Sequence, residues 1–245
     1  GVLVAKAAAD TVKRVTQELG GKSPNIIFED ANLEKDVTAG VRRMMNNTGQ
    51  SCNAPSRMLV QSSVYDQAIK IAKTAVEDIA VDQPTKEGEH LGPLSSRVQF
   101  DKVQGLIKKG IEEGADVVAG GLGKPDGLDI GYFVKPTVFS GVSNDMTIAQ
   151  EEIFGPVLTM ISFDTEEQAI EIANDTPYGL AAYFSTASEE RAARVASQLR
   201  AGMISVNSAS QNYTAPFGGY KQSGNGREWG EFGFDDFLEI KGITR

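Results

Sequence analysis

The sequence predicts an α/β domain in which a largely parallel sheet is flanked by helices. Short apolar stretches typical of buried strands alternate along the chain with longer segments whose apolar residues recur at helical spacing. This alternation favours a parallel sheet, because parallel strands need a long crossover connection that is usually a helix. The chain has 245 residues, 40% of them hydrophobic, which is enough for one large core.

The first third of the chain begins with two helix-and-strand pairs. An Ala-rich helix is expected over 2–12, and residues 13–19 alternate as a short strand that two glycines end. A second helix is expected over 33–47 and a strand over 57–61. Glu18 then falls at a strand end, and ligands of open parallel sheets gather at the carboxyl ends of strands.

The rest of the chain continues the alternation. Residues 120–131 are rich in Gly, Pro and Asp and predict a surface loop, and Pro136 predicts an edge position for the strand that contains it, because proline cannot donate to a ladder. Helices are expected at about 69–79, 100–114, 165–175 and 188–199, and strands at 116–120, 132–139, 157–163, 180–186 and 202–207.

Composition narrows the class of protein. The 24 basic and 33 acidic residues give a net charge of −9, which argues against nucleic acid as a partner because it repels phosphate. One cysteine and one histidine, His90, exclude a disulfide framework within the chain and a four-ligand zinc site, so we expect no metal. We expect a reducing, cytoplasmic location and no membrane partner, because no apolar run or signal-peptide pattern is visible.

Cys52 lies in a polar helix-to-strand connection, "NNTGQSCNAPSR", rather than in an apolar stretch. It is either a small unreactive loop residue or a nucleophile, and a nucleophilic cysteine acts as the thiolate. No histidine is near it in the sequence, so a Cys–His hydrolase would depend on His90 alone, which lies in the polar loop "KEGEHLGP". The residues around Cys52 therefore leave both readings open.

Four stretches in order carry a resemblance to a known family: "ELGGKSPNIIF" (18–28), "NTGQSCNAPSR" (47–57), "EEIFGPV" (151–157) and "PFGGYKQSGNGRE" (216–228). Together they resemble the aldehyde dehydrogenase superfamily over essentially the whole chain. The 34-residue separation of Glu18 and Cys52 equals the family's separation of general base and nucleophile. By itself the last stretch is a Gly-rich loop without the spacing of a known phosphate-binding motif.

The resemblance implies a site residue by residue. Cys52 would add to the aldehyde carbonyl, giving a thiohemiacetal and then a thioester, and its backbone N–H would be one donor to the oxyanion. Glu18 would activate the water that hydrolyses the thioester. Glu152 would bind the hydroxyls of the nicotinamide ribose of NAD or NADP, and Phe154 would pack near the nicotinamide.

The resemblance also implies how the chain is divided. Family chains are about twice as long, so we expect residues 1–19 to be the tail of a coenzyme-binding domain whose remainder is missing. Residues 20–218 would be the catalytic domain, and 219–245 a return segment that ends in an oligomerisation strand, "DFLEIKGITR". We therefore expect this chain to be inactive alone, and the full-length parent to oxidise a small-molecule aldehyde as a homodimer or homotetramer.

Two alternatives to an aldehyde dehydrogenase remain open. One is a non-enzymatic structural homologue, which would have no need of Glu18 and Cys52. The other is a thioesterase-like hydrolase, from which Glu152 and Phe154 discriminate because only hydride transfer requires them. The stretch 208–215 lies where the family lines its substrate tunnel, and its Tyr213 hints at a mid-sized or polar aldehyde. Four cations are expected to be structural or surface ion-pair residues: Lys22, Arg57, Lys221 and Arg227.

Overall fold

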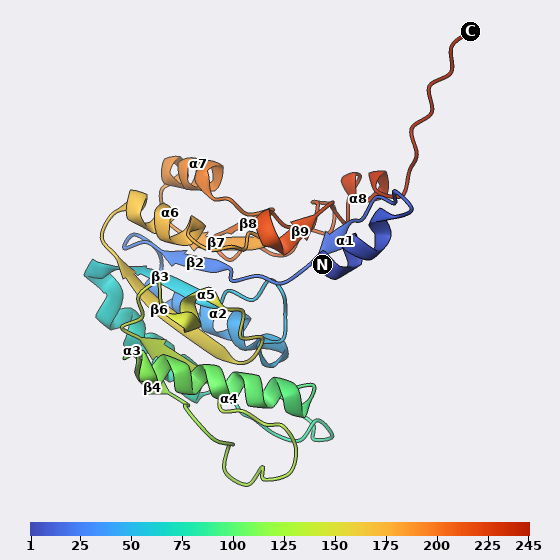
Figure 1. Ribbon diagram of the computed structural model, residues 1–245. Coiled ribbons are helices and arrows are strands. Elements are labelled where there is room, and N and C mark those ends of the chain that lie inside the picture. Colours follow the sequence, from blue (N-terminus) through green and yellow to red (C-terminus); the bar gives the residue numbers. More distant parts are fainter.

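A computed structural model describes all residues from 1 to 245 and contains one seven-stranded sheet with helices on both faces (Figure 1). The strand order is β4-β5-β6-β3-β2-β7-β8. Every neighbouring pair is parallel except β4 and β5, which are antiparallel. The α/β class with a largely parallel sheet is therefore confirmed.

The elements have the following bounds. The strands of the sheet are β2 (Pro24–Ile27), β3 (Arg57–Gln61), β4 (Asp116–Ala119), β5 (Thr137–Ser140), β6 (Val157–Phe163), β7 (Ala181–Ser185) and β8 (Met203–Val206). The helices are α1 (Val2–Ala9), α2 (Leu33–Met45), α3 (Tyr65–Glu77), α4 (Arg97–Glu112), α5 (Thr147–Gln150), α6 (Glu166–Asn174), α7 (Glu189–Gln198) and α8 (Phe232–Asp235). A separate antiparallel ribbon joins β1 (Gln17–Glu18) to β9 (Gly224–Asn225).

The sheet separates two apolar cores, because successive side chains of a strand point to opposite faces. Ile26 of β2 belongs to the larger core of 25 buried residues, which also contains side chains of α4, α5, α6 and α7. Ile27, the next residue, belongs to the core of 16 buried residues, which α2 and α3 cover. Burial on both faces explains why the central strands are continuously apolar rather than alternating.

Helix α2 has defined ends, which matters because it leads into the segment that contains Cys52. The Asn32 side chain accepts a hydrogen bond from the Lys35 N–H and caps the first turn. The first turn contains two acidic residues and the last turn two arginines, an arrangement that complements the helix dipole. The start of the segment that contains Cys52 is therefore fixed by the end of α2.

Three strand predictions differ from the structure. The strand with Pro136 is not at an edge: β5 lies between β4 and β6, and the proline is tolerated because it precedes the first paired residue, Thr137. The strand expected over 13–19 is reduced to two residues that pair with β9. The four-residue strand β2 was not predicted, although it lies near the middle of the sheet.

The two end regions of the chain are joined, since Arg14 donates to the Leu238 carbonyl oxygen and to the Glu239 carboxylate, before the last residues extend away from the molecule (Figure 1). None of the side chains of α1 is buried. Residues 237–245 are exposed and form no strand within this chain, so the oligomerisation strand stays a prediction that a second subunit would have to complete. No helix has both the length and the apolarity needed to cross a bilayer.

Candidate active site

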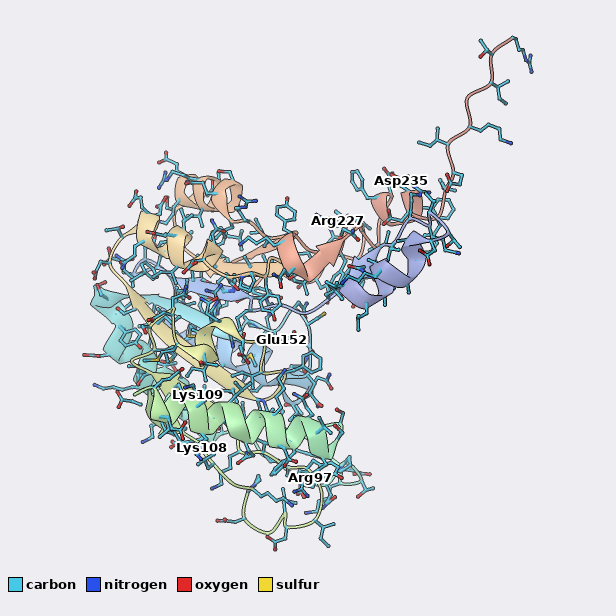
Figure 2. The ribbon with its side chains drawn as sticks, viewed as in Figure 1. Arg97, Lys108, Lys109, Glu152, Arg227 and Asp235 are labelled. Atoms are coloured by element: carbon cyan, nitrogen blue, oxygen red, sulfur yellow. The ribbon has the colours of Figure 1, made fainter.

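The residues singled out by the sequence meet at one edge of the sheet, the edge formed by the amino ends of the strands. Glu18 precedes β2, Cys52 precedes β3, and Glu152 and Phe154 precede β6. Because β2, β3 and β6 are parallel neighbours, the segments that enter them lie side by side. Figure 2 shows Glu152 at this edge, on the side of the sheet that faces α1.

This position corrects the expectation that Glu18 lies at a carboxyl end of the parallel sheet. Glu18 ends β1, but β1 belongs to the antiparallel ribbon with β9 and not to the seven-stranded sheet. The rule that places ligands at carboxyl ends of parallel strands therefore does not describe this site. Glu18 is instead placed by pairing with Gly224, 206 residues further along the chain, which no local pattern reveals.

Left-handed backbone turns the chain between α2 and Cys52. Asn47 and Thr48 have φ angles of 53° and 57°, and Gly49 has 69°. A Cβ on Gly49 would lie 2.1 Å from the carbonyl oxygen of Gly155, so only glycine allows this approach. The connection that contains Cys52 is thereby packed against the segment that contains Phe154.

Phe154 is held in an uncommon conformation. Its φ is 57°, a left-handed value that a bulky residue adopts only when its surroundings impose it. The Gln99 side chain from α4 donates hydrogen bonds to the carbonyl oxygens of Ile153 and Phe154, at 2.8 and 2.9 Å. The turn before β6 is therefore fixed from the helix that covers it.

The segment from Glu18 to Lys22 approaches both Cys52 and Glu152 closely, and two glycines make this possible. A Cβ on Gly20 would lie 2.3 Å from Glu152 Oε2, and one on Gly21 would lie 2.6 Å from the Cys52 carbonyl oxygen. The Gly21 N–H donates to Glu152 Oε1 at 3.0 Å. These glycines are needed for close approach, since neither has a positive φ.

Glu18 and Cys52 alter each other's pKa, so they share one environment. Burial, followed by the charge and hydrogen bonding of Glu18, raises the pKa of the half-buried Cys52 thiol to about 11, although hydrogen bonds from the backbone N–H groups of Asn53 and Cys52 lower it. Desolvation also raises the pKa of Glu18, contact with Cys52 lowers it, and Glu228 and Glu152 raise it. The thiol is therefore protonated at neutral pH, with a carboxylate beside it to accept the proton.

Two cations lie buried next to this segment. Arg57 is fully buried, and its guanidinium donates to four oxygens: Lys22 O, Asn144 Oδ1, Ile172 O and Ala173 O. Lys22 is 1% exposed, and its Nζ has no hydrogen-bond partner. Burial lowers the pKa of Lys22 to about 7, and the charge of Arg57 contributes. Neither residue forms a surface ion pair, and the hydrogen bonds of Arg57 agree with the structural role that was the other expected alternative.

The other two cations, Lys221 and Arg227, lie in the fourth motif and donate hydrogen bonds to backbone carbonyl oxygens. Lys221 Nζ donates to the carbonyl oxygens of Asn174 and Thr176, and Arg227 donates to those of Gly219 and Gly226. The structural role expected for Lys221 and Arg227 agrees with these bonds.

Sequence reasoning gave no role to two residues near the site. Glu228 ends the fourth motif and raises the pKa of Glu18. Tyr183 donates its hydroxyl hydrogen bond to the carbonyl oxygen of Asn53, next to Cys52. Tyr183 lies inside an apolar strand, where the sequence pattern predicts that an aromatic residue belongs to the core. Only the folded structure reveals the contact of its hydroxyl with Asn53. Tyr213 is 68% exposed, and its ring lies 4.9 Å from that of Trp229 at an interplanar angle of 50°. Its role in substrate binding stays a prediction.

The residues are compatible with a nicotinamide dinucleotide and offer no metal site. Glu152 uses Oε1 to accept the Gly21 N–H, and no protein group donates to Oε2, so this oxygen is free to accept from a sugar hydroxyl. No group of three or more His, Cys, Asp or Glu side chains is arranged to hold a metal ion.

Comparison with known proteins gives one consistent result. A model of the aldehyde dehydrogenase family matches residues 1–243. A 3-succinoylsemialdehyde-pyridine dehydrogenase from Pseudomonas sp. is 57% identical over 243 residues, which are 99% of this chain and 51% of that protein. The chain thus spans about half the length of the curated relatives it matches.

Solved structures agree with this result. Aldehyde dehydrogenase C from Pseudomonas syringae, a mutant crystallised with NAD+ and octanal, superimposes with a TM-score of 0.95 at 50% identity, over 97% of this chain and 49% of that one. The NAD+ complex of an aldehyde dehydrogenase from Bacillus cereus gives 0.94 at 43% identity, over 98% and 49%. This chain belongs to the aldehyde dehydrogenase family.

Proposed function

We propose that the protein containing this chain oxidises an aldehyde to a carboxylic acid, with NAD or NADP as the electron acceptor. The observation that carries the proposal is that Cys52 and Glu18 perturb each other's pKa at the edge of the sheet that Glu152 also faces. Membership of the family supports it, as do the NAD+ complexes of similar proteins.

In the first half of the reaction Cys52 forms a covalent bond with the substrate. The thiol must lose its proton before it adds to the aldehyde carbon, because its pKa of about 11 keeps it neutral at physiological pH. Glu18 is the neighbouring acceptor for that proton. The carbonyl electron pair then moves to oxygen, where the Cys52 N–H can stabilise the developing charge.

Bound NAD(P)+ would supply the acceptor for a hydride. The hydrogen would depart from the substrate carbon together with the C–H bonding electrons, and the Cys52 adduct would become a thioester. Glu152 and Phe154 are the residues of this chain that would hold the cofactor at the site. A carboxylate can accept hydrogen bonds from two vicinal hydroxyls, which suits Glu152 to a ribose.

Glu18 first releases the thiol proton to solvent, to which it is exposed. In the second half the regenerated carboxylate takes a proton from water while the water oxygen attacks the thioester carbon. The C–S bond breaks, the carboxylic acid leaves, and Cys52 is released as the thiolate. The raised pKa of Glu18 suits this role, because a carboxylate with a higher pKa is a stronger base.

We further propose the division of the chain into 1–19, 20–218 and 219–245, and assembly with a second copy as a homodimer or homotetramer. Residues 237–245 are exposed and carry apolar side chains, including Ile240 at 100% and Ile243 at 79% exposure, which suits a segment that another subunit covers. The chain alone is expected to lack turnover, because most of the cofactor site would lie outside it.

The test is an assay of the complete polypeptide with octanal and with a pyridine-bearing semialdehyde, each with NAD+ and NADP+. We expect reduced cofactor to form, and Cys52→Ala to abolish it by about 1000-fold or more, while Ser51→Ala retains it. Undiminished turnover in Cys52→Ala overturns the proposal. Ester hydrolysis by Cys52 without reduction of either cofactor supports the thioesterase-like alternative instead.

A further inference from the structure

Tyr183 stands apart from the other residues of β7 because its side chain leaves the core and approaches the segment around Cys52. Its neighbours Ala182 and Phe184 belong to the larger core, so Tyr183 points to the opposite face, which α2 covers. It pairs with Asn25 in β2 and with Ser205 in β8, so its backbone is held between two strands. A rigid strand therefore fixes where the Tyr183 hydroxyl lies.

The hydroxyl of Tyr183 reaches across 130 residues of sequence to the turn that contains Cys52. It donates to the Asn53 carbonyl oxygen at 3.0 Å, and no other group of the chain donates to that oxygen. The turn itself is closed by the Ala54 N–H, which donates to the Ser51 carbonyl at 3.1 Å. Cys52 and Asn53 are thus the two central residues of a turn that one side chain anchors to the sheet.

The ring of Tyr183 also contacts the helix that leads into the turn. The Arg43 guanidinium, in the last turn of α2, lies over the ring at 4.9 Å from its centroid. Tyr183 therefore contacts the chain on both sides of the left-handed residues 47–49. A rotation of the turn would have to break the hydroxyl contact, the cation–π contact, or both.

The orientation of this turn matters because its amides face the sulfur. Hydrogen bonding by the backbone N–H groups of Asn53 and Cys52 opposes the rise in the pKa of the thiol. The Asn53 carbonyl held by Tyr183 belongs to the peptide unit that follows these two. Fixing that carbonyl restricts the rotation of the adjacent N–H groups, since successive peptide planes share a Cα atom.

We propose that Tyr183 is a positioning residue that fixes the Ser51–Ala54 turn, so that the N–H groups of Cys52 and Asn53 face the sulfur and the oxygen of the bound aldehyde. The proposal rests on the function proposed for Cys52. It assigns the effect to the hydroxyl, because the ring alone could pack without orienting a carbonyl. Tyr183→Phe separates the two, since it keeps the ring and its contact with Arg43.

The experiment measures the rate at which iodoacetamide alkylates Cys52, as a function of pH, in the complete polypeptide, together with kcat and KM. We expect Tyr183→Phe to slow alkylation at pH 8 by about three- to tenfold and to shift its pH profile upward, the loss that one hydrogen bond accounts for. The value of kcat falls similarly, and KM for the cofactor stays the same.

Tyr65→Phe is the matched control. The Tyr65 hydroxyl also bonds backbone of the same sheet, donating to Met160 O at 2.9 Å and accepting from the Gly141 N–H, but Tyr65 lies next to β3's carboxyl end, away from Cys52. We expect its alkylation profile to match wild type. If Tyr183→Phe also matches wild type, the proposal is overturned.

A second variant, Arg43→Gln, keeps the hydroxyl and removes the cation over the ring. It should retain at least half of the alkylation rate, and a loss as large as that of Tyr183→Phe overturns the assignment to the hydroxyl. Alkylation does not depend on turnover, so the outcome is separate from the proposed function. That function fails if Cys52→Ala still turns over, whatever Tyr183 does.

Discussion

The segment from Glu18 to Lys22 separates two regions of opposite charge. On one side lie the carboxylates of Glu18 and Glu152 with Cys52, where the side chains are exposed or half-buried. On the other side lie Lys22 and Arg57, both sealed from solvent. The groups proposed to act in the reaction thus stay accessible to solvent and substrate, whereas the two cations are shielded from both.

The buried side contains a second contrast. Arg57 has four acceptors for its guanidinium, whereas the Lys22 ammonium has none. A buried charge is tolerated when hydrogen bonds replace its hydration and is costly otherwise. Arg57 should therefore stabilise the fold and Lys22 should destabilise it, and substitutions on both sides of the segment test this comparison.

The largest effect is expected from Arg57→Met. The variant leaves buried carbonyl oxygens without a donor, so we expect the free energy of unfolding to fall by about 3–5 kcal/mol in urea denaturation. Arg97→Met is the control, because Arg97 is 72% exposed and pairs only with Asp101 on the surface, and its loss should change stability by about 0.5 kcal/mol or less. Equal losses would break the comparison.

Glu18→Gln should increase the reactivity of Cys52 and decrease turnover, so it separates the two halves of the reaction. Removing the carboxylate lowers the pKa of the Cys52 thiol, since the charge and hydrogen bond of Glu18 raise it, so alkylation at pH 8 becomes faster. Turnover nevertheless falls by about 100-fold or more, because no base activates the water. Slower alkylation, measured beside turnover in the complete polypeptide, would contradict the geometry.

Gly20→Ala tests the close approach of Glu152. The added Cβ would lie 2.3 Å from Glu152 Oε2 and must displace the carboxylate, so we expect KM for the cofactor to rise about tenfold. Gly92→Ala is the control, because a Cβ there meets nothing within 4 Å. An unchanged KM in Gly20→Ala would mean that Glu152 does not hold the cofactor.

The smallest effect is expected from Lys22→Met, and its sign is opposite to that of Arg57→Met. The pKa of Lys22 falls from 10.5 to about 7 on folding, so the unfolded chain binds more protons between these pH values. The destabilisation by Lys22 is complete below pH 7 and fades as the pH rises toward 10.5. We expect Lys22→Met to raise the free energy of unfolding by about 1 kcal/mol or more at pH 6, with the two curves converging at high pH.

A lower stability for Lys22→Met at every pH would show that the ammonium has a partner in solution. Urea denaturation of both proteins across the pH range decides the matter.

The sequence predicts elements that local patterns determine. Residues 57–61 and 157–163 have the strand bounds that were expected, because both are apolar runs bounded by polar residues. The strand β2 was missed because four residues that begin with Pro24 carry too little periodicity. Its place in the sheet depends on partners 33 and 158 residues further along the chain, which no local window of sequence contains.

Some residues of the candidate site could likewise be identified from the sequence, and others could not. The resemblance identified Glu18, Cys52, Glu152 and Phe154 from motifs, and the structure places them at one edge. It could not identify Tyr183, because its hydroxyl contact depends on which way β7 faces. Nor could it identify Lys22 as buried, because lysine in a Gly-rich stretch reads as surface.

Glu18, Cys52, Glu152 and Phe154 lie at the amino ends of the strands, so the opposite edge of the sheet is free of them. There the chain turns after β2 and β3 through exposed residues, and Ser63 donates a hydrogen bond to Glu29. After β7, the buried Thr186 donates to the Asp30 carboxylate. A fluorescent label or an affinity tag placed in the exposed turn at Ser62 would report on the molecule without entering the path of substrate. Protein engineers thus have an attachment point whose distance from the reacting groups is built into the length of the strands.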